Sequence, residues 1–164
     1  SRMESFEIIL EKYNGEMSEE EKIHYTTKKN EVYKKLLKNM SEKDLTAEVK
    51  STLEGLREYG LKLAIGSSSK NAGFILERLG LGNFFDAVSD GNNITNSKPD
   101  PEVFLKAAEF LGEKPEDCFV VEDAYAGIDA AKNAGMQAVG IGDAAGYEKA
   151  DKRIQSFRDL LNYV

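Results

Sequence analysis

Three short polar segments of this sequence carry residue types that could handle a phosphate and a divalent cation. They are GSSSKN at residues 66–71, NSKPDP at 96–101 and EDAYAG at 122–127. Hydroxyls and a lysine ahead of a helix can bind a phosphate group. A lysine on a loop stiffened by prolines presents a fixed cation. Two adjacent carboxylates suit Mg²⁺. Together the segments predict chemistry on a phosphate.

Each segment taken alone also has a plainer interpretation. Residues 66–71, here called the serine loop, could simply cap a helix. Helix capping and phosphate binding explain this loop about equally well. Lys98 alone is best explained as a solvated surface lysine, since most lysines are exposed. The Glu122-Asp123 pair favours a cation, because carboxylates next to a buried strand are costly without compensation. The functional interpretation therefore depends on the three segments acting together.

The elements around these segments alternate between strand and helix from about residue 46 onward. Apolar runs predict strands over residues 61–66, 85–88, 118–121 and 137–141, and the almost continuous run at 118–121 suggests a sheet covered on both faces. Helical spacing or helix-end residues predict helices over 49–59, 71–79, 101–111, 126–134 and 157–163. This alternation favours parallel βαβ units. Ligands bind beyond the carboxyl ends of such strands, where the three polar segments lie.

The first forty residues follow a different pattern. Phe6, Ile9, Leu10 and Tyr13 keep helical spacing, and no strand-like run is present. A long charged helix is predicted from about residue 18 to 39, with Ser18 and Glu21 forming a capping box. We therefore expect a helical unit over residues 1–44 and an α/β unit over residues 45–164.

Composition narrows the classes of function. The chain has 164 residues and a formal charge of −7, which disfavours nucleic-acid binding through clustered lysine and arginine. No run of about 18 apolar residues could span a membrane. The single cysteine, Cys118, excludes a disulfide framework, and together with the lack of a targeting signal it favours the cytoplasm. We expect a monomer that acts on a small molecule.

The order of the three segments resembles the haloacid dehalogenase-like phosphotransferase superfamily, and the stretches SKPDPEVFLKAAEFLG and VVEDAYAGIDAAKNAGM match it closely. This resemblance implies an α/β fold, with a Rossmann-like parallel-sheet core and a small helical cap. Within the superfamily the sequence is most similar to the β-phosphoglucomutase family. The residues that carry this similarity are the pair Arg2 and Ser5, Lys29-Asn30, and Ser69-Lys70-Asn71.

The resemblance implies interconversion of β-glucose 1-phosphate and glucose 6-phosphate, through a bisphosphate and with Mg²⁺ as cofactor. Ser67 and Lys98 would contact the phosphoryl group in transfer, and Glu122 and Asp123 would hold the metal. The remaining roles are also carried over by resemblance. Arg2, Ser69, Lys70 and Asn71 would bind the second phosphate, Ser5 would bind substrate or phosphate, and Lys29 and Asn30 would contact sugar hydroxyls or phosphate.

One expected motif is absent from the sequence. The superfamily carries its nucleophile in an Asp-x-Asp after the first core strand, and no Asp-x-Asp occurs in these 164 residues. A phosphoaspartate route needs that carboxylate. We therefore expect the residues to belong to a longer protein, or to be completed by a second chain that supplies the strand. Two alternatives stay open: a phosphatase of a small phosphate ester, and a catalytically incompetent fragment that only binds phosphate esters or a partner.

Overall fold

The computed structural model describes residues 17–164, and its contacts divide the chain into two compact units, residues 1–41 and 42–164. The described part of the first unit is dominated by helix α2 (Glu19–Lys38). The predicted capping box is confirmed: the Glu21 amide donates to Ser18 Oγ, and the Ser18 amide donates to the Glu21 carboxylate. Glutamates fill the first turn and lysines the last, as the helix dipole favours.

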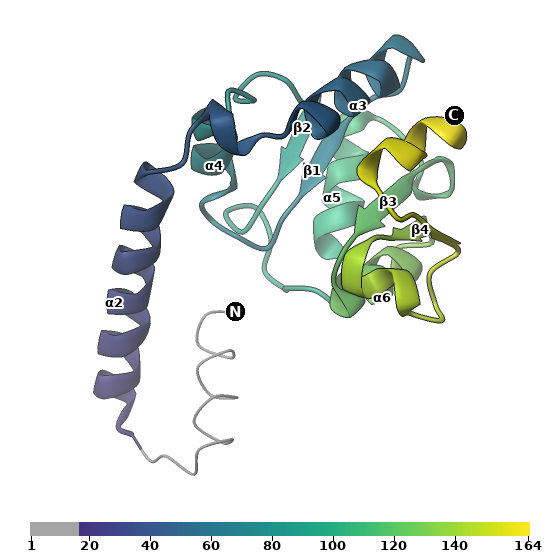
Figure 1. Ribbon diagram of the computed structural model, residues 1–164. Coiled ribbons are helices and arrows are strands. Elements are labelled where there is room, and N and C mark those ends of the chain that lie inside the picture. The colour runs from purple at the N-terminus through teal and green to yellow at the C-terminus, as the bar shows by residue number, and fades with distance from the viewer. Residues whose placement is uncertain (1–16) are drawn as a thin grey trace. The chain divides into compact units, whose positions relative to one another are not determined.

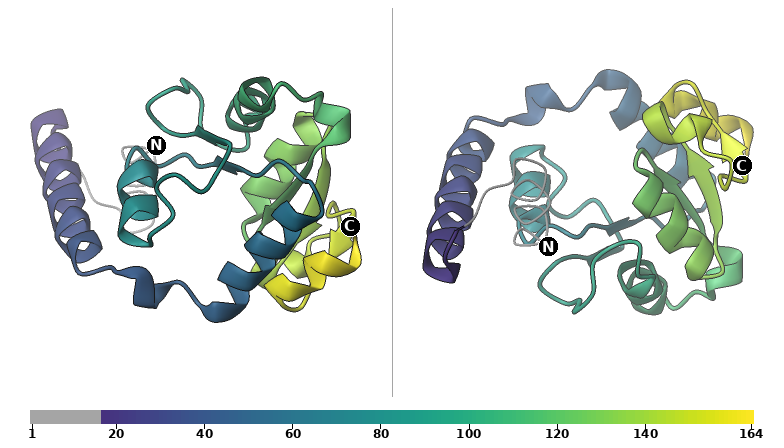
Figure 2. Two further views of the ribbon diagram at one scale, coloured as in Figure 1. Left: turned by 90° about the horizontal axis from the view of Figure 1, so that it is seen from above. Right: turned by 90° about the horizontal axis from the view of Figure 1, so that it is seen from below.

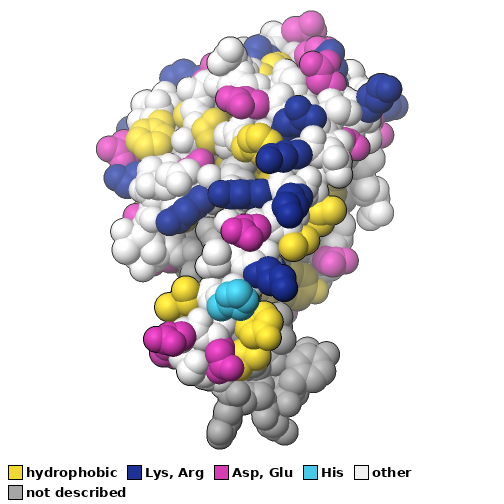
Figure 3. Space-filling model, turned by 90° about the vertical axis from the view of Figure 1, so that its left-hand side faces the viewer, with side chains coloured by type: hydrophobic (Ala, Val, Ile, Leu, Met, Phe, Trp, Pro, Cys, Tyr) yellow, Lys and Arg dark blue, Asp and Glu magenta, His cyan; other side chains and the backbone are white. Residues whose placement is uncertain are grey.

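The surface of α2 mixes basic and apolar side chains (Figure 3). Lysines are spread along the helix, and only Thr26 and Leu37 are buried. Several large apolar side chains are instead exposed: Ile23, Tyr25, Val32, Tyr33 and Leu36. Within the described residues, burial therefore contributes little to this helix, and its capping box and end charges favour it.

The second unit alternates helices and strands, as the sequence predicts (Figure 1). Its main elements, in chain order, are α3 (Ala47–Glu58), β1 (Ala64–Gly66), α4 (Ala72–Arg78), β2 (Ala87–Ser89), α5 (Glu102–Leu111), β3 (Phe119–Glu122), α6 (Tyr125–Asn133), β4 (Gln137–Gly140) and β5 (Lys152–Arg153). Four short 3₁₀ helices are η1 (Glu42–Asp44), η2 (Pro115–Asp117), η3 (Gly142–Gly146) and η4 (Phe157–Asn162). The predicted last helix is therefore a 3₁₀ helix.

All strand pairs in the described residues are parallel, which confirms the predicted α/β architecture. The strands form two separate sheets, β1-β2 and β3-β4-β5 (Figures 1 and 2). In the first sheet Ala64 lies opposite Ala87, and in the second Phe119 lies opposite Gln137. The first strand is shorter than the predicted 61–66, because only Ala64–Gly66 pair with β2.

Strand β3 is packed on both faces, as predicted, because Val120 contacts one core cluster and Val121, on the opposite face, contacts another. Within residues 17–164 it pairs with β4 on one side only, and Phe119 keeps 38% of its surface exposed. Strand β4 lies between β3 and β5, and its Ala138 and Val139 are almost completely buried. The apolar run at 118–121 therefore belongs to a strand that is packed on both faces and, within the described residues, has one unpaired edge.

Helix α5 connects the two sheets. It contacts β1, β2 and helix α6. Val103 of α5 and Ile128 of α6 are fully buried in one core that also takes in Ala138 of β4. This packing fixes the loops at the carboxyl ends of β1, β2 and β3 in a single unit. None of the described helices is long and apolar enough to cross a membrane.

Candidate functional site

Lys98 and Glu122 form the centre of the site. The Lys98 ammonium, from the loop between β2 and α5, makes a close ion pair with Glu122 Oε1 at the end of β3. Both side chains are largely buried, with 17% and 11% of their surfaces exposed. The other Glu122 oxygen lies 3.4 Å from the Ala124 amide. The buried lysine and the acidic pair thus lie at the same end of the core.

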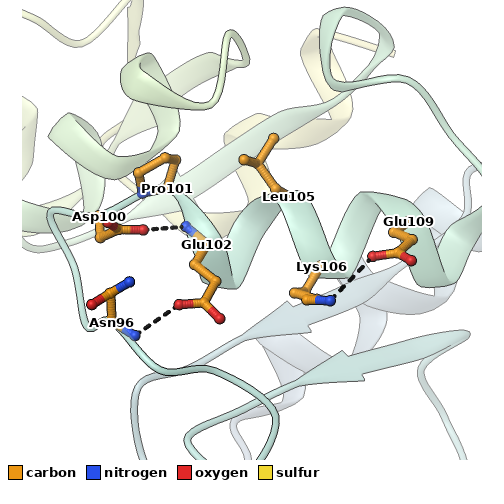
Figure 4. Close-up of a pocket in the computed structure, with 7 residues that line it drawn as sticks. All are labelled: Asn96, Asp100, Pro101, Glu102, Leu105, Lys106 and Glu109. Atoms are coloured by element: carbon orange, nitrogen blue, oxygen red, sulfur yellow. Dashed lines mark hydrogen bonds and ion pairs between the residues drawn. The ribbon is translucent and has the colours of Figure 1, made fainter.

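The loop that carries Lys98 is held at the start of α5 (Figure 4). The Glu102 carboxylate accepts hydrogen bonds from the Asn96 amide at 2.7 Å and the Thr95 amide at 3.0 Å, and the Asp100 carboxylate accepts from the Glu102 amide at 2.9 Å. The bond from the Asn96 amide is the main cause that holds the pKa of Glu102 below its usual value. Lys98 therefore projects from a braced turn.

Small residues make room for this ion pair. The Lys98 ammonium lies 4.7 Å from the centre of the buried Phe104 ring. A Cβ on Gly66 would lie 2.7 Å from that ring, and a Cβ on Gly127 would lie 2.1–2.4 Å from the Glu122 carboxylate. Gly66 ends β1 and Gly127 lies in α6. Glycine at these two positions lets the phenyl ring and the carboxylate approach the lysine from opposite elements.

The serine loop after β1 is organised by its own hydroxyls. Ser67 Oγ accepts from the Ser69 amide at 3.2 Å, and Ser69 Oγ accepts from the Asn71 amide at 3.1 Å. Asn71 stands at the N-cap of α4 without a side-chain capping bond. Lys70 is exposed at the tip. The loop thus has a defined shape, with its hydroxyls used as acceptors and able to donate to a ligand.

A second loop, after β2, is hydrogen-bonded to the serine loop. The Gly91 amide donates to the Ser69 carbonyl at 3.2 Å, and Asn92 Nδ2 donates to the Lys70 carbonyl at 3.1 Å. A Cβ on Gly91 would come within 2.6 Å of the Ser68 carbonyl oxygen. Only a residue without a side chain allows this approach. The two loops therefore support each other at the ends of paired strands.

Asp123 lies on the solvent side of Glu122. Its exposed carboxylate lines an open pocket of about 550 Å³ together with Ala124, Tyr125 and Asp143. Carboxylate oxygens and water are what Mg²⁺ prefers, so Asp123 with Glu122 or Asp143 fits part of a magnesium coordination shell. Among residues 17–164, no group of three or more His, Cys, Asp or Glu side chains is placed to hold a metal. The remaining ligands must therefore be water, substrate or other groups.

The other candidate residues fall in the first unit. Lys29 and Asn30 lie next to each other on α2, with Lys29 exposed and Asn30 half-buried. Arg2 and Ser5 lie outside the described residues. Their assignment to the second phosphate or the sugar stays a prediction.

A model of the haloacid dehalogenase-like hydrolase family matches residues 3–141. This match covers most of the chain. The chain belongs to the haloacid dehalogenase-like hydrolase family. The family's fold accounts for the parallel sheets with helices between the strands.

Curated family members with similar sequences include a mutase and a phosphatase. The chain is 38% identical over 162 residues to the β-phosphoglucomutase of Bacillus subtilis, covering 98% of the chain and 72% of that protein. It is 33% identical over 141 residues to a phosphorylated carbohydrates phosphatase of Thermotoga maritima, covering 84% of the chain and 59% of that protein. The chain therefore belongs to a family of enzymes, and it spans only part of the length of each of these two relatives.

Solved structures support the same family. The crystal structure of β-phosphoglucomutase from Clostridium difficile has a TM-score of 0.88 and 38% identity, and the match covers 98% of the chain and 73% of that structure. A predicted phosphoglycolate phosphatase from Haemophilus somnus superposes with a TM-score of 0.78 at 25% identity, covering 94% of the chain and 71% of that structure. The fold is therefore common to mutases and phosphatases of this family.

Sequence reasoning missed the residues that support the site. Phe104, Gly91 and Asn92 act through contacts between separate elements, which no local pattern reveals. Asp143 joins Asp123 in one pocket although it follows a different strand. Gly127 was the one available signal, since a glycine beside an acidic pair suggests a close approach.

Proposed function

We propose that the chain supplies the phosphate-binding and charge-neutralising part of a site for phosphoryl transfer on a sugar phosphate. The observation that carries the proposal is the Lys98–Glu122 ion pair, with Asp123 beside it and the braced serine loop in the same α/β unit. Phosphoryl transfer depends mainly on positioning and on neutralising charge, which these groups provide. In this proposal Ser67 donates a hydrogen bond to the phosphoryl group and Lys98 neutralises it.

The similarity to the Bacillus and Clostridium proteins favours β-phosphoglucomutase activity within this class. A mutase must bind a bisphosphate and so needs a second anion site. Lys70 and Ser69 supply suitable groups at the tip of the serine loop, and Asn71 lies next to them. Arg2, Ser5, Lys29 and Asn30 of the first unit are proposed as further residues that contact the substrate.

We propose Mg²⁺ as the cofactor, held by Asp123 with Glu122 as a further ligand or as a neighbour that orients it. The ion, when bound, offsets negative charge on the phosphoryl oxygens. The open pocket at Asp123 leaves room for water ligands.

The attacking carboxylate is proposed to come from a strand that inserts between β1 and β3. Two observations support this. Within residues 17–164, β1 pairs only with β2 and β3 only with β4, so each has an open edge. Both strands are also only partly buried along their length. An open edge is a template for a further parallel strand, from the same polypeptide or a second one.

A phosphatase is the second candidate, favoured by the similarity to the Thermotoga carbohydrate phosphatase. Such an enzyme needs Ser67, Lys98 and the acidic pair but no second anion site. Replacing Lys70 therefore separates the two: a mutase loses most of its activity, whereas a phosphatase of a small ester keeps it.

The test is complementation. The 164-residue chain is mixed or co-expressed with the part of the Bacillus β-phosphoglucomutase that has no counterpart in it, and given β-glucose 1-phosphate, Mg²⁺ and glucose 1,6-bisphosphate. We expect glucose 6-phosphate from the mixture and from neither part alone, and a loss of about 100-fold or more with Lys98→Ala. Release of inorganic phosphate instead supports the phosphatase. A mixture that associates but transforms no phosphate ester contradicts both and favours a binding protein.

A further inference from the structure

Asn133, the last residue of helix α6, contacts the loop that carries Lys98. Its side-chain amide Nδ2 donates a hydrogen bond to the Pro99 carbonyl at 3.1 Å, across 34 positions of the chain. Asn133 is exposed and lies outside the three polar segments, so neither burial nor the sequence pattern singles it out. A bond to the residue directly after Lys98 nevertheless limits where the lysine ammonium can lie.

The end of α6 is a fixed point from which to hold a loop. Lys132, next to Asn133, pairs with the Asp151 carboxylate at 2.7 Å, and the same carboxylate accepts from the Ala138 amide of β4 at 2.7 Å. Ile128, earlier in the helix, is fully buried in the core to which α5 also contributes. Asn133 therefore donates from a helix that is attached both to α5 and to the second sheet.

The Lys98 loop is thereby joined to the segment β3–α6 at two points of different chemistry. One is the ion pair of the Lys98 side chain with Glu122, the last residue of β3. The other is the backbone attachment at Pro99, which leaves the Lys98 ammonium untouched. The bonds made by Asp100 and Glu102 shape the turn ahead of α5, but they do not connect it to α6.

The two attachments respond differently when an anion binds. A phosphoryl group that binds the Lys98 ammonium competes for it with the Glu122 carboxylate, because both are anionic acceptors. The ion pair therefore weakens when the lysine is needed for charge neutralisation. The bond from Asn133 to the Pro99 carbonyl is not part of this competition, so it can keep the loop in place while the ammonium changes partners.

We propose that Asn133 is a positioning residue for Lys98, which holds the lysine loop on α6 while the ammonium exchanges the Glu122 carboxylate for a phosphoryl oxygen. This role rests on the proposed function, and it adds a residue that touches neither the substrate nor the metal. Losing the Asn133 amide should weaken anion binding through the loop and leave the fold intact.

The test measures binding of inorganic phosphate to the full chain by calorimetry, in the presence of Mg²⁺. Asn133→Ala should weaken binding about fivefold, the factor that one hydrogen bond is worth. Asn133→Asp has nearly the same shape but only accepts hydrogen bonds when ionised, so it should lose at least as much. Asn133→Gln keeps an amide donor and should recover most of the affinity. Asn83→Ala, at an exposed asparagine between α4 and β2, is the matched control.

A second measurement follows the loop itself. The Asp100 amide donates to the Ser97 carbonyl at 3.1 Å, across Lys98. Its hydrogen exchange should become about fivefold faster in Asn133→Ala and stay at the native rate in Asn83→Ala. Thermal melting identifies any unfolded variant, and if Asn133→Ala is unfolded the comparison of Asn133→Asp with Asn133→Gln decides.

The outcomes separate this role from the proposed function. Native phosphate affinity in Asn133→Ala or Asn133→Asp overturns the role and leaves the proposed function standing. Equal losses in Asn133→Ala and Asn133→Gln also overturn it, because the amide donor then makes no difference. Weaker binding with unchanged exchange at Asp100 overturns it as well, since the effect then does not pass through the loop. A native chain that binds no phosphate contradicts the proposed function itself, and the role of Asn133 with it.

Discussion

The ammonium of Lys98 pairs with the carboxylate of Glu122; Lys98 lies in the loop after β2, and Glu122 is the last residue of β3, in the other sheet. The pair links the end of β3 to the loop that enters α5. Because both side chains are largely buried, each needs the other to offset the cost of leaving water. The same contact that stabilises the core therefore fixes a cation where a phosphoryl group is proposed to bind.

Breaking this pair should destabilise the core. Lys98→Met leaves the Glu122 carboxylate buried without its partner, and Glu122→Gln removes the charge that compensates Lys98. Each should lower the free energy of unfolding by about 1–3 kcal/mol. The double variant should lose less than the sum, with a coupling of at least about 1 kcal/mol in urea denaturation.

The control pair is Lys114 and Glu116, whose side chains are 76% and 75% exposed and 3.9 Å apart. Lys114→Met should change stability by less than about 0.5 kcal/mol. Additive effects of Lys98→Met and Glu122→Gln would show that the two residues do not interact in solution.

Gly127→Ala should disturb Glu122 without removing it. The new Cβ would lie within 2.4 Å of both carboxylate oxygens, so the carboxylate must move away from Lys98. We expect about tenfold weaker binding of inorganic phosphate, measured by calorimetry, because Lys98 then loses its fixed position. Gly146→Ala adds a Cβ with nothing within 4 Å and is the matched control. Equal affinities for the two variants would argue against this role of Gly127.

Gly91→Ala should displace the serine loop. Its Cβ would meet the Ser68 carbonyl at 2.6 Å and the Lys70 amide at 2.9 Å, which are backbone atoms that cannot rotate away. Since Ser67 and Ser69 shape the proposed phosphate site, binding of glucose 6-phosphate should weaken about tenfold or more. Gly73→Ala, nearby in α4 with open space around it, should bind normally. Normal binding by Gly91→Ala would show that the close contact at Gly91 does not shape the proposed phosphate site.

Acidification should loosen the Lys98 loop through Glu102. Hydrogen bonds from the Asn96 and Thr95 amides lower the pKa of Glu102 from its ordinary value of 4.5. A depressed folded pKa gives stability that is present above pH 4.5 and is lost as the pH falls through the lower folded value. Amide exchange at Asn96 and Thr95 should therefore accelerate below about pH 4.5 relative to the intrinsic rate.

Glu102→Gln is the control for this effect. It removes the titrating group, so the excess acceleration at Asn96 and Thr95 should disappear in this variant. The same pH dependence in Glu102→Gln and in the native chain would assign the effect to another carboxylate.

Local signals in the sequence predicted much of the fold. The capping box at Ser18 and the apolar face of residues 101–111 are short-range patterns, and both correspond to observed helices. Strand lengths were less predictable, because a strand extends only as far as its partner pairs with it. Leu61 and Leu63 are apolar but lie outside β1, and the edge position of β3 depends on strand order.

The candidate site was predictable in its residue types and not in its contacts. Ser67, Lys98 and Asp123 each follow a strand, whereas Glu122 is the last residue of β3. Which carboxylate forms the ion pair with Lys98 depends on the packing of side chains around Phe104 and Gly127. Residue spacing in the sequence does not predict this packing. The stacking of Tyr125 on Tyr147 likewise joins residues that are far apart in the chain.

The most direct test of the account is an amide chemical-shift titration of the full chain with glucose 6-phosphate and Mg²⁺. We predict saturable shifts that gather at residues 66–71, 96–101 and 122–125, and that disappear with Lys98→Ala in a folded protein. Shifts confined to other surfaces, or no shifts at millimolar ligand, would contradict the claim that these three loops form one site for a sugar phosphate.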